Sequence, residues 1–421
     1  MKRCGFWALV VSAFFMLSGA AGANVFFVTV DRDFARAFTG IVRETGPGTV
    51  YNSWNSNLPG NFHGDTLAWA FRDSAGAEKL LLREFLGHGG ADSIFIYDLN
   101  NWDRPLLNTA AWNVTNIMDV VSVGQYLYVV SDTRNIGRDS GEIIKVNMND
   151  YSVAARYPFS VNQNGLLRRP VRVIAYNGHI YVLSNATTDF ISWGASEVHK
   201  FDSYLTPIGA PAEVGINVGG MGSPAALHEG NLYVACLGTE YGSIWEVDLR
   251  NMISRRLTNL DNNFPDYSHP MAYGISIAKD GTALLLIADF YTPAGVYLSS
   301  IENLGNPGRW TRAGFTPRTG WSFGALYDEH NGVFWLMNGT HLEVRGRNGH
   351  LLRTLTPEDL GGNIYSIAVI EAFSVGGDDD TGGNGGGDND RGGGSGGCNT
   401  GIGLLALLIT FHAGLMKIRK K

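Results

Sequence analysis

The sequence predicts an all-β fold assembled from a repeated unit of four short strands. Gly230–Leu237 combines β-branched and aromatic residues with a Gly-Asn turn signal at its start, which is typical of a β-strand. Similar stretches occur at Asn24–Asp31, Gln125–Asp132, Gly178–Asn185, Thr282–Phe290 and Gly332–Gly339. Each lies between further strand-like stretches, and the unit repeats about every 50 residues. Four short strands at that period indicate a β-propeller.

The repeat units follow one another at a regular step. In the unit that begins at Asn116, Gln125–Asp132 is followed by strands at Gly141–Asn147 and Ser152–Pro158. The unit starts are His63, Asn116, Arg169, Gly222, Met271, Trp321 and Asn363. A single sheet or a sandwich would not require such regular spacing.

The two ends of the repeat region determine the expected number of blades. Asn363–Glu371 is a first strand with no partner after it, and Asn24–Asp31 is a second strand with no partner before it. Ala35–Thr45 and Gly48–Trp54 supply a third and a fourth strand. We therefore predict seven blades, with both chain ends in one blade so that no sheet edge stays open. The alternatives are six blades with an N-terminal extension, or eight if Gly60–Trp112 forms two.

The N-terminus has the pattern of a secretory signal peptide. Lys2 and Arg3 precede the apolar run Phe6–Leu17, and Ala21–Ala23 forms a small-residue cleavage site. We predict that residues 1–23 are removed. An uncleaved N-terminal anchor is the alternative.

The C-terminus continues with a linker and a short apolar segment. The predicted propeller spans residues 24–375, and residues 376–397 are rich in Gly and Asp, a composition that forms flexible linkers. Residues 398–421 contain an apolar run, Ile402–Met416, and a basic end. The apolar run is short for a transmembrane helix, which needs about 20 residues. The basic end is expected to stay cytoplasmic.

This arrangement resembles a bacterial C-terminal sorting signal. Gly396–Gly401, which reads Gly-Gly-Cys-Asn-Thr-Gly, the apolar run and the basic end are similar to the Synergist-CTERM type, whose layout is related to GlyGly-CTERM signals. The resemblance implies a membrane-held precursor that an intramembrane sorting protease cuts near Cys398, so that the protein reaches the cell surface. Gly396, Gly397 and Cys398 are the implied processing residues. A plain single-span anchor is the alternative.

Cysteine content and charge restrict the possible partners. After signal removal only Cys236 and Cys398 remain, one in a predicted core strand and one at the sorting site, so no intramolecular disulfide is expected. The formal net charge is −7, and the two terminal segments carry six Lys/Arg and no Asp/Glu, which leaves −13 for the rest. Such an acidic chain disfavours nucleic acid and anionic membrane surfaces as ligands.

The repeat also resembles a broad class of bacterial extracytoplasmic propellers. Gly230–Val234 followed by Ile244–Asp248 is similar to repeats of the NHL and YVTN types, although the string Tyr-Val-Thr-Asn is absent. The resemblance implies a scaffold whose relatives include both binding proteins and enzymes.

The fourth position of the first strands gives the candidate ligand-binding residues in the channel. This position is small or polar in every unit, whereas the next is apolar, as expected for a half-buried strand facing a channel. Asp119 and Arg172 belong to neighbouring blades, and we expect an ion pair between them, either as part of a polar ligand site or as a structural link. The residues at this position are Thr66, Asp119, Arg172, Ala225, Gly274, Gly324 and Ser366.

The remaining candidates are aromatic residues in or beside predicted loops. Trp54, Trp193 and Trp321 could stack on sugar rings, anchor a protein partner, or pack between blades. The histidines form no metal-binding string, and no nucleophile or dinucleotide motif stands in a strand–turn–helix context. No catalytic residue, metal or cofactor is therefore expected.

Together these features predict an exported cell-envelope propeller that binds a protein or a glycan without catalysis. The alternative is an envelope hydrolase or lyase with a site in the channel, which would require at least three His, Asp or Glu side chains converging at one channel mouth. An extracytoplasmic quinoprotein is a third class, but no repeat signature supports it.

Overall fold

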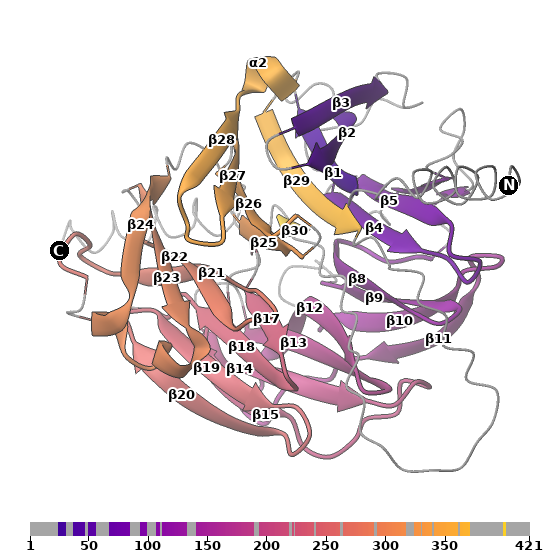
Figure 1. Ribbon diagram of the computed structural model, residues 1–421. Coiled ribbons are helices and arrows are strands. Elements are labelled where there is room, and N and C mark those ends of the chain that lie inside the picture. The colour runs from indigo at the N-terminus through magenta and orange to yellow at the C-terminus, as the bar shows by residue number, and fades with distance from the viewer. Residues whose placement is uncertain are drawn as a thin grey trace, which may run out of the picture.

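The structure is a computed structural model. It describes residues 24–30, 37–46, 49–55, 67–84, 93–98, 107–109, 112–132, 140–188, 193–218, 221–222, 224–239, 241–261, 264–289, 293–316, 324–329, 331–338, 341–360, 363–370 and 399–400. The described part is a β-propeller, with four-stranded antiparallel sheets that follow one another around a centre (Figure 1).

Six of the sheets are each built from four strands that are consecutive in the chain. They consist of β4–β7 (Leu67–Arg72, Glu78–Glu84, Ser93–Asp98, Leu107–Thr109), β8–β11 (Ile117–Val123, Tyr126–Ser131, Glu142–Asn147, Val153–Pro158), β12–β15 (Leu167–Tyr176, His179–Thr187, Trp193–Phe201, Ala212–Ile216), β17–β20 (Ala225–His228, Asn231–Cys236, Ser243–Asp248, Ile253–Asn259), β21–β24 (Met271–Ile277, Thr282–Ala288, Ala294–Ser300, Thr311–Thr316) and β25–β28 (Gly324–Asp328, Val333–Met337, Leu342–Gly346, Leu351–Leu355).

A further four-stranded sheet combines strands from distant parts of the chain. Its order is β29-β1-β2-β3, with β29 at Asn363–Ile370, β1 at Asn24–Val30, β2 at Ala37–Gly46 and β3 at Thr49–Asn55. The remaining elements are β16 (Met221–Gly222), which pairs with β30 (Asn399–Thr400), two short 3-10 helices, η1 (Ile301–Asn303) and η2 (Pro307–Arg309), and one helical turn, α2 (Pro357–Leu360).

Tight turns join the first and second strands of several sheets. Between β12 and β13, Asn177 and Gly178 have φ values of 47° and 73°. Positive φ at both central positions is the type I′ geometry, whose twist matches that of the flanking strands. The Asn-Gly sequence therefore sets the register in which Tyr176 faces His179.

Strand direction separates two faces of the propeller. In each of the six consecutive sheets, the first strand begins and the second strand ends on the same face, because neighbouring strands are antiparallel. The connections between blades and those between second and third strands leave on this face, which we call the loop face. They include the segment 159–166. The opposite face carries the turn at Asn177–Gly178 and the longer connections 202–211 and 301–310.

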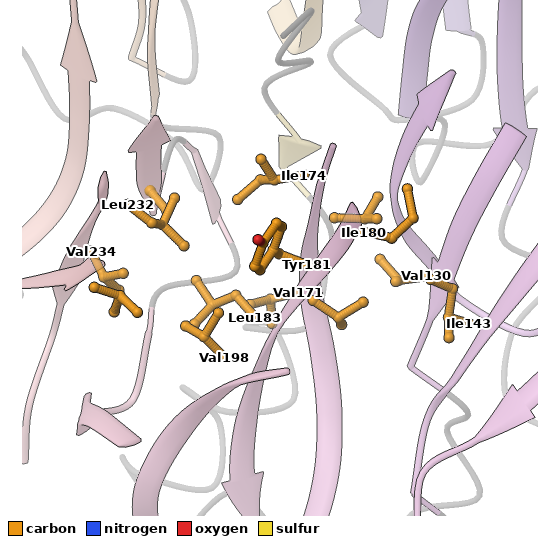
Figure 2. Close-up of a cluster of buried hydrophobic side chains, with 14 of the residues drawn as sticks. Val130, Ile143, Val171, Ile174, Ile180, Tyr181, Leu183, Val198, Leu232 and Val234 are labelled. Atoms are coloured by element: carbon orange, nitrogen blue, oxygen red, sulfur yellow. The ribbon is translucent and has the colours of Figure 1, made fainter. Parts of the chain in front are cut away.

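The core lies between the sheets rather than inside any one of them. In one large cluster, Val130 and Ile143 come from β9 and β10, Leu183 and Val198 from β13 and β14, and Val234 from β18. Figure 2 shows these side chains filling the space between neighbouring sheets. Each of the five is fully enclosed. Because neighbouring sheets cover both faces of an inner strand, the sequence of such a strand is a nearly continuous run of apolar residues.

The strands expected from the opening repeat are confirmed to within one or two residues at most ends. The predicted stretch Gly230–Leu237 is β18, and Gln125–Asp132 is β9. In the part of the stretch Gly60–Trp112 that the structure describes, the strands form one four-stranded sheet, β4–β7. The unit placed at Gly222 differs, because β17 begins only at Ala225. Pro224 before it has no N–H to donate to a strand ladder, although its carbonyl accepts from Ala235 N at 2.7 Å.

Packing between the sheets can be tested at Leu183. Leu183→Ala should lower the free energy of unfolding by about 2–5 kcal/mol, because it leaves a cavity between sheets. Leu352 is 59% exposed, and Leu352→Ala, the matched control, should change stability by less than about 0.5 kcal/mol. Denaturant unfolding of both variants measures the difference. Equal effects would contradict this description of the core.

Candidate functional site

Asp119 and Arg172 form the ion pair expected from the sequence. Arg172 Nε lies 3.6 Å from Asp119 Oδ2. The carboxylate also accepts hydrogen bonds from Trp69 Nε1 at 3.2 Å and from the backbone N–H of Val173 at 2.9 Å. The pair therefore connects three neighbouring blades through β4, β8 and β12.

A β-bulge precedes each member of this pair. The pairing register shifts between Ile117 and Asp119 in β8, and between Pro170 and Arg172 in β12. The same shift occurs between Ala272 and Gly274 in β21. A bulge inserts one residue and re-aims the side chains that follow it. In β8, β12 and β21 the bulge therefore sets the direction of the side chain at this position of the first strand.

Both charged groups are buried, which differs from the expected half-buried surface of a channel. The side chain of Asp119 is 2% exposed and that of Arg172 is 9% exposed. Val120 and Val173, the next residues along, are buried as well, because the first strands of neighbouring blades pack against one another. Burial raises the pKa of Asp119, while the Arg172 guanidinium acts to lower it. The described residues therefore favour the structural interpretation of this pair.

Further polar contacts join neighbouring blades where second strands end on the loop face. Asp132, just after β9, accepts a hydrogen bond from Arg169 Nη1 of the next blade at 2.5 Å. Asn185 occupies the equivalent place in β13. Its side chain donates to Val218 O and accepts from Val218 N, both at 2.8 Å. Asp132 thus binds the following blade directly, whereas Asn185 holds Val218, which forms a β-bridge with Cys236 of the following blade.

Three junctions between blades contain what we call a glutamate clasp, defined by the pairs Glu142–Arg156, Glu197–Arg168 and Glu343–Arg345. In each clasp a glutamate on a third strand binds an arginine of its own sheet. That arginine donates to a carbonyl at or just after the last strand of the preceding blade. The acceptors are Trp112 O for Arg156, Ser160 O and Val161 O for Arg168, and Phe315 O for Arg345.

Sequence reasoning missed the clasps because the arginine comes from a different strand each time. Arg156 lies on β11, a fourth strand, Arg168 on β12, a first strand, and Arg345 on β27, a third strand. The glutamates do share a signal, since each is followed by Ile or Val in a third strand. That pattern could have identified the acidic half of the clasp but not its partner.

An exposed aromatic pair lies on the loop face. The rings of Tyr241 and His269 stack with centroids 6.0 Å apart and planes at 27°. Tyr241 precedes β19 and His269 precedes β21, so the two come from neighbouring blades. Tyr241 is 38% exposed. This pair offers an accessible aromatic surface to a ligand.

The other predicted site residues are only partly described. Trp193 begins β14 and is half-buried, opposite Thr187. Trp54 lies in β3, opposite Gly40. Ser366 lies in β29, opposite Val28. Thr66, Trp321, Gly396, Gly397 and Cys398 lie outside the described residues.

Within the described ranges, no group of three or more His, Cys, Asp or Glu side chains is placed to hold a metal ion. Cys236 is fully buried, and burial raises the pKa of its thiol to about 12. A thiol in that environment stays protonated and is a poor nucleophile.

Comparison with known proteins identifies the fold alone. No protein-family model matches the chain, and no curated protein is significantly similar to it. Among solved structures, a presumed 6-phosphogluconolactonase from Bacteroides uniformis matches with a TM-score of 0.55 and 11% identity, over 83% of this chain and 100% of that one. A protein from Lactobacillus plantarum matches with a TM-score of 0.55 and 15% identity over the same shares. Both similarities support a β-propeller.

Removing one member of the Asp119–Arg172 pair should be far more harmful than replacing both. Asp119→Ala removes the carboxylate beside a buried guanidinium and should lower the free energy of unfolding by about 3–5 kcal/mol. Adding Arg172→Met should recover much of that loss, because no buried charge then remains. A double-mutant cycle from denaturant unfolding gives the coupling between the two residues. Additive effects would show that the ion pair is energetically unimportant.

The Glu197 clasp should contribute to acid sensitivity. Burial acts to raise the pKa of Glu197, but hydrogen bonds from His199 and Arg168 outweigh it and lower the pKa from 4.5 to about 2. A depressed carboxyl pKa stabilises the fold above the unfolded value, and this contribution is lost as pH falls from 4.5 towards 2. Glu197→Gln should therefore flatten the pH dependence of unfolding in that window. If stability falls with acid in Glu197→Gln as steeply as in the unmodified protein, the role assigned to Glu197 is wrong.

Proposed function

We propose that this chain is an exported cell-envelope propeller that binds a protein or a glycan through its loop face without catalysis. The observation that carries the proposal is the exposed Tyr241–His269 pair, which stands on connections of two neighbouring blades on the loop face. Binding residues in repeat proteins are usually carried by such loops on a rigid scaffold. The buried ion pairs and glutamate clasps beneath them supply that rigidity.

The proposed scaffold is a ring of seven blades closed by the two chain ends. The pairing of β1 with β29, in which Phe27 faces Ile367 and Val25 faces Val369, supports this closure. The sheet that contains them has β29 against β4 on one side and against β26 on the other. These contacts are those that a seventh blade would make between the first and the last of the six consecutive sheets.

Closure can be tested by cross-linking its two strands. In a Val25→Cys/Val369→Cys variant, a disulfide should form on mild oxidation, because these positions are directly opposite in register. The bond should also raise the midpoint of thermal unfolding, since it closes a very long loop. The matched control, Val25→Cys/Ser366→Cys, is out of register and should cross-link poorly. Equal yields would rule out the proposed pairing.

The binding role can be tested with glycan and protein arrays probed by the region 24–375. A specific ligand is expected, and Tyr241→Ala should weaken its binding by about tenfold, as for a typical aromatic contact residue. Tyr204→Ala is the matched control. Tyr204 is 77% exposed, but it lies in the turn between β14 and β15, on the opposite face. An equal loss of binding in both variants, or no ligand on either array, would contradict binding through the loop face.

The proposed location is the cell envelope or surface, reached through the N-terminal signal and the C-terminal sorting segment. Within the described residues, no helix has the length and apolar character required to cross a membrane. The apolar run Ile402–Met416 lies outside them. Mass spectrometry of the native C-terminus should find an end near Cys398 if an intramembrane protease acts there. A native chain that still ends at Lys421 would instead support the alternative of a plain single-span membrane anchor.

The alternative proposal is an envelope hydrolase or lyase. Its support is that one similar structure is a presumed 6-phosphogluconolactonase, although 11% identity indicates a shared fold only. Among the described residues, no three His, Cys, Asp or Glu side chains converge in a way that could hold a metal ion for such a reaction. Hydrolysis of a panel of lactones, above the rate in buffer, would favour the enzyme over the binding scaffold.

A further inference from the structure

One of the three glutamate clasps contains a histidine, and the other two do not. His199 follows Glu197 by two residues on β14. The corresponding positions are Ile144 in the clasp of Glu142 and Arg345 in the clasp of Glu343. Histidine is the side chain whose ordinary pKa allows a charge change near neutral pH. Only this clasp therefore has a carboxylate partner that can change its charge under mild acid.

His199 is enclosed by polar groups on one edge and by aromatic rings elsewhere. Its Nε2 lies 3.1 Å from Glu197 Oε2 and 3.1 Å from Ser184 Oγ of β13. Phe159 packs edge-on at a centroid distance of 5.0 Å, and Phe201 lies at 6.5 Å. The imidazole is 12% exposed. There is little water to stabilise a positive charge at this place.

Arg168 connects Glu197 to the loop face. Its Nε and Nη2 bind the two carboxylate oxygens of Glu197 at 2.5 and 3.2 Å. Its Nη1 donates to Ser160 O at 3.1 Å and to Val161 O at 3.0 Å, at the start of the connection between β11 and β12. The position of this connection therefore depends on Glu197 holding Arg168 in place.

We propose that His199 makes this clasp an acid-sensitive latch on the connection 159–166. When neutral, His199 leaves Glu197 to balance the charge of Arg168. When protonated, it becomes a second cation competing for the same carboxylate, so the enclosed group carries a net positive charge. Arg168 then releases the carbonyls of Ser160 and Val161, and the connection opens towards solvent.

The electrostatic surroundings of His199 support this direction. Burial lowers the pKa of His199, contact with Glu197 raises it, and Arg168 lowers it, with a net decrease from 6.5. Its other neighbours, Ser184, Phe159 and Phe201, carry no charge. A histidine with a lower pKa in the closed state takes up its proton more readily when the latch is open. The open state is therefore favoured as pH falls below about 6.5.

Hydrogen exchange of the full chain without ligand tests the latch independently of the proposed binding function. The reporters are the Asn162 and Leu166 amides, which bond to Leu166 O and Asn162 Oδ1 at 2.8 and 2.9 Å. After correction for intrinsic rates, their protection should fall at about pH 5 relative to neutral pH. A fall of about tenfold is expected for each unit by which the His199 pKa differs between closed and open states.

His199→Gln keeps a neutral hydrogen-bond donor and should make this protection independent of pH. The clasp of Glu343 and Arg345 is the internal control, because amides near Phe315 should show no change in either protein. Protection that is constant with pH in the unmodified chain, or equally pH-dependent in His199→Gln, would overturn the proposal. If the variant misfolds, an NMR titration of His199 in the unmodified chain tests the proposal instead. The midpoint of that titration must lie below pH 6.5, and the amides must lose protection over the same pH range.

Discussion

The carboxylate–arginine–carbonyl contact at the junctions between blades is the interaction on which the arrangement of this propeller depends. Wherever a chain passes from the last strand of one blade to the first strand of the next, backbone carbonyls leave the sheet ladder and need donors. Arg156, Arg168 and Arg345 provide them at three junctions. At Arg345, where the guanidinium is buried, a glutamate of the same sheet balances its charge.

The need of buried polar groups for partners also explains why the inner strands combine apolar and polar side chains. Apolar side chains on both faces hold neighbouring sheets together, but they do not determine how one sheet is rotated against the next. Directional contacts do so, through Asp119 with Arg172 and through Asn185 with the backbone of Val218. Such buried polar groups add little net stability, yet a displaced blade would leave them unpaired. We therefore regard them as alignment devices beneath the loop face.

Much of the fold could be predicted because its signals are local. The repeated stretch around Tyr233, its period and its Gly-Asn or Asn-Gly turns depend on residues close together in the chain. The ion pair of Asp119 and Arg172 was also predictable, because both occupy the same position of successive repeats. The clasps were not, since Arg156, Arg168 and Arg345 occupy different positions in their units. A period cannot reveal a contact whose members are not periodic.

The sequence by itself determined the all-β class, the strand boundaries and the column of small and polar residues in the first strands. These follow from alternation, β-branched composition and turn residues, which act over a few residues. Only the tertiary structure decided that Asp119 and Arg172 are buried, and that His199 shares Glu197 with an arginine from another strand. Burial and shared hydrogen bonds depend on how neighbouring sheets pack around a centre, and no short stretch of sequence contains that information.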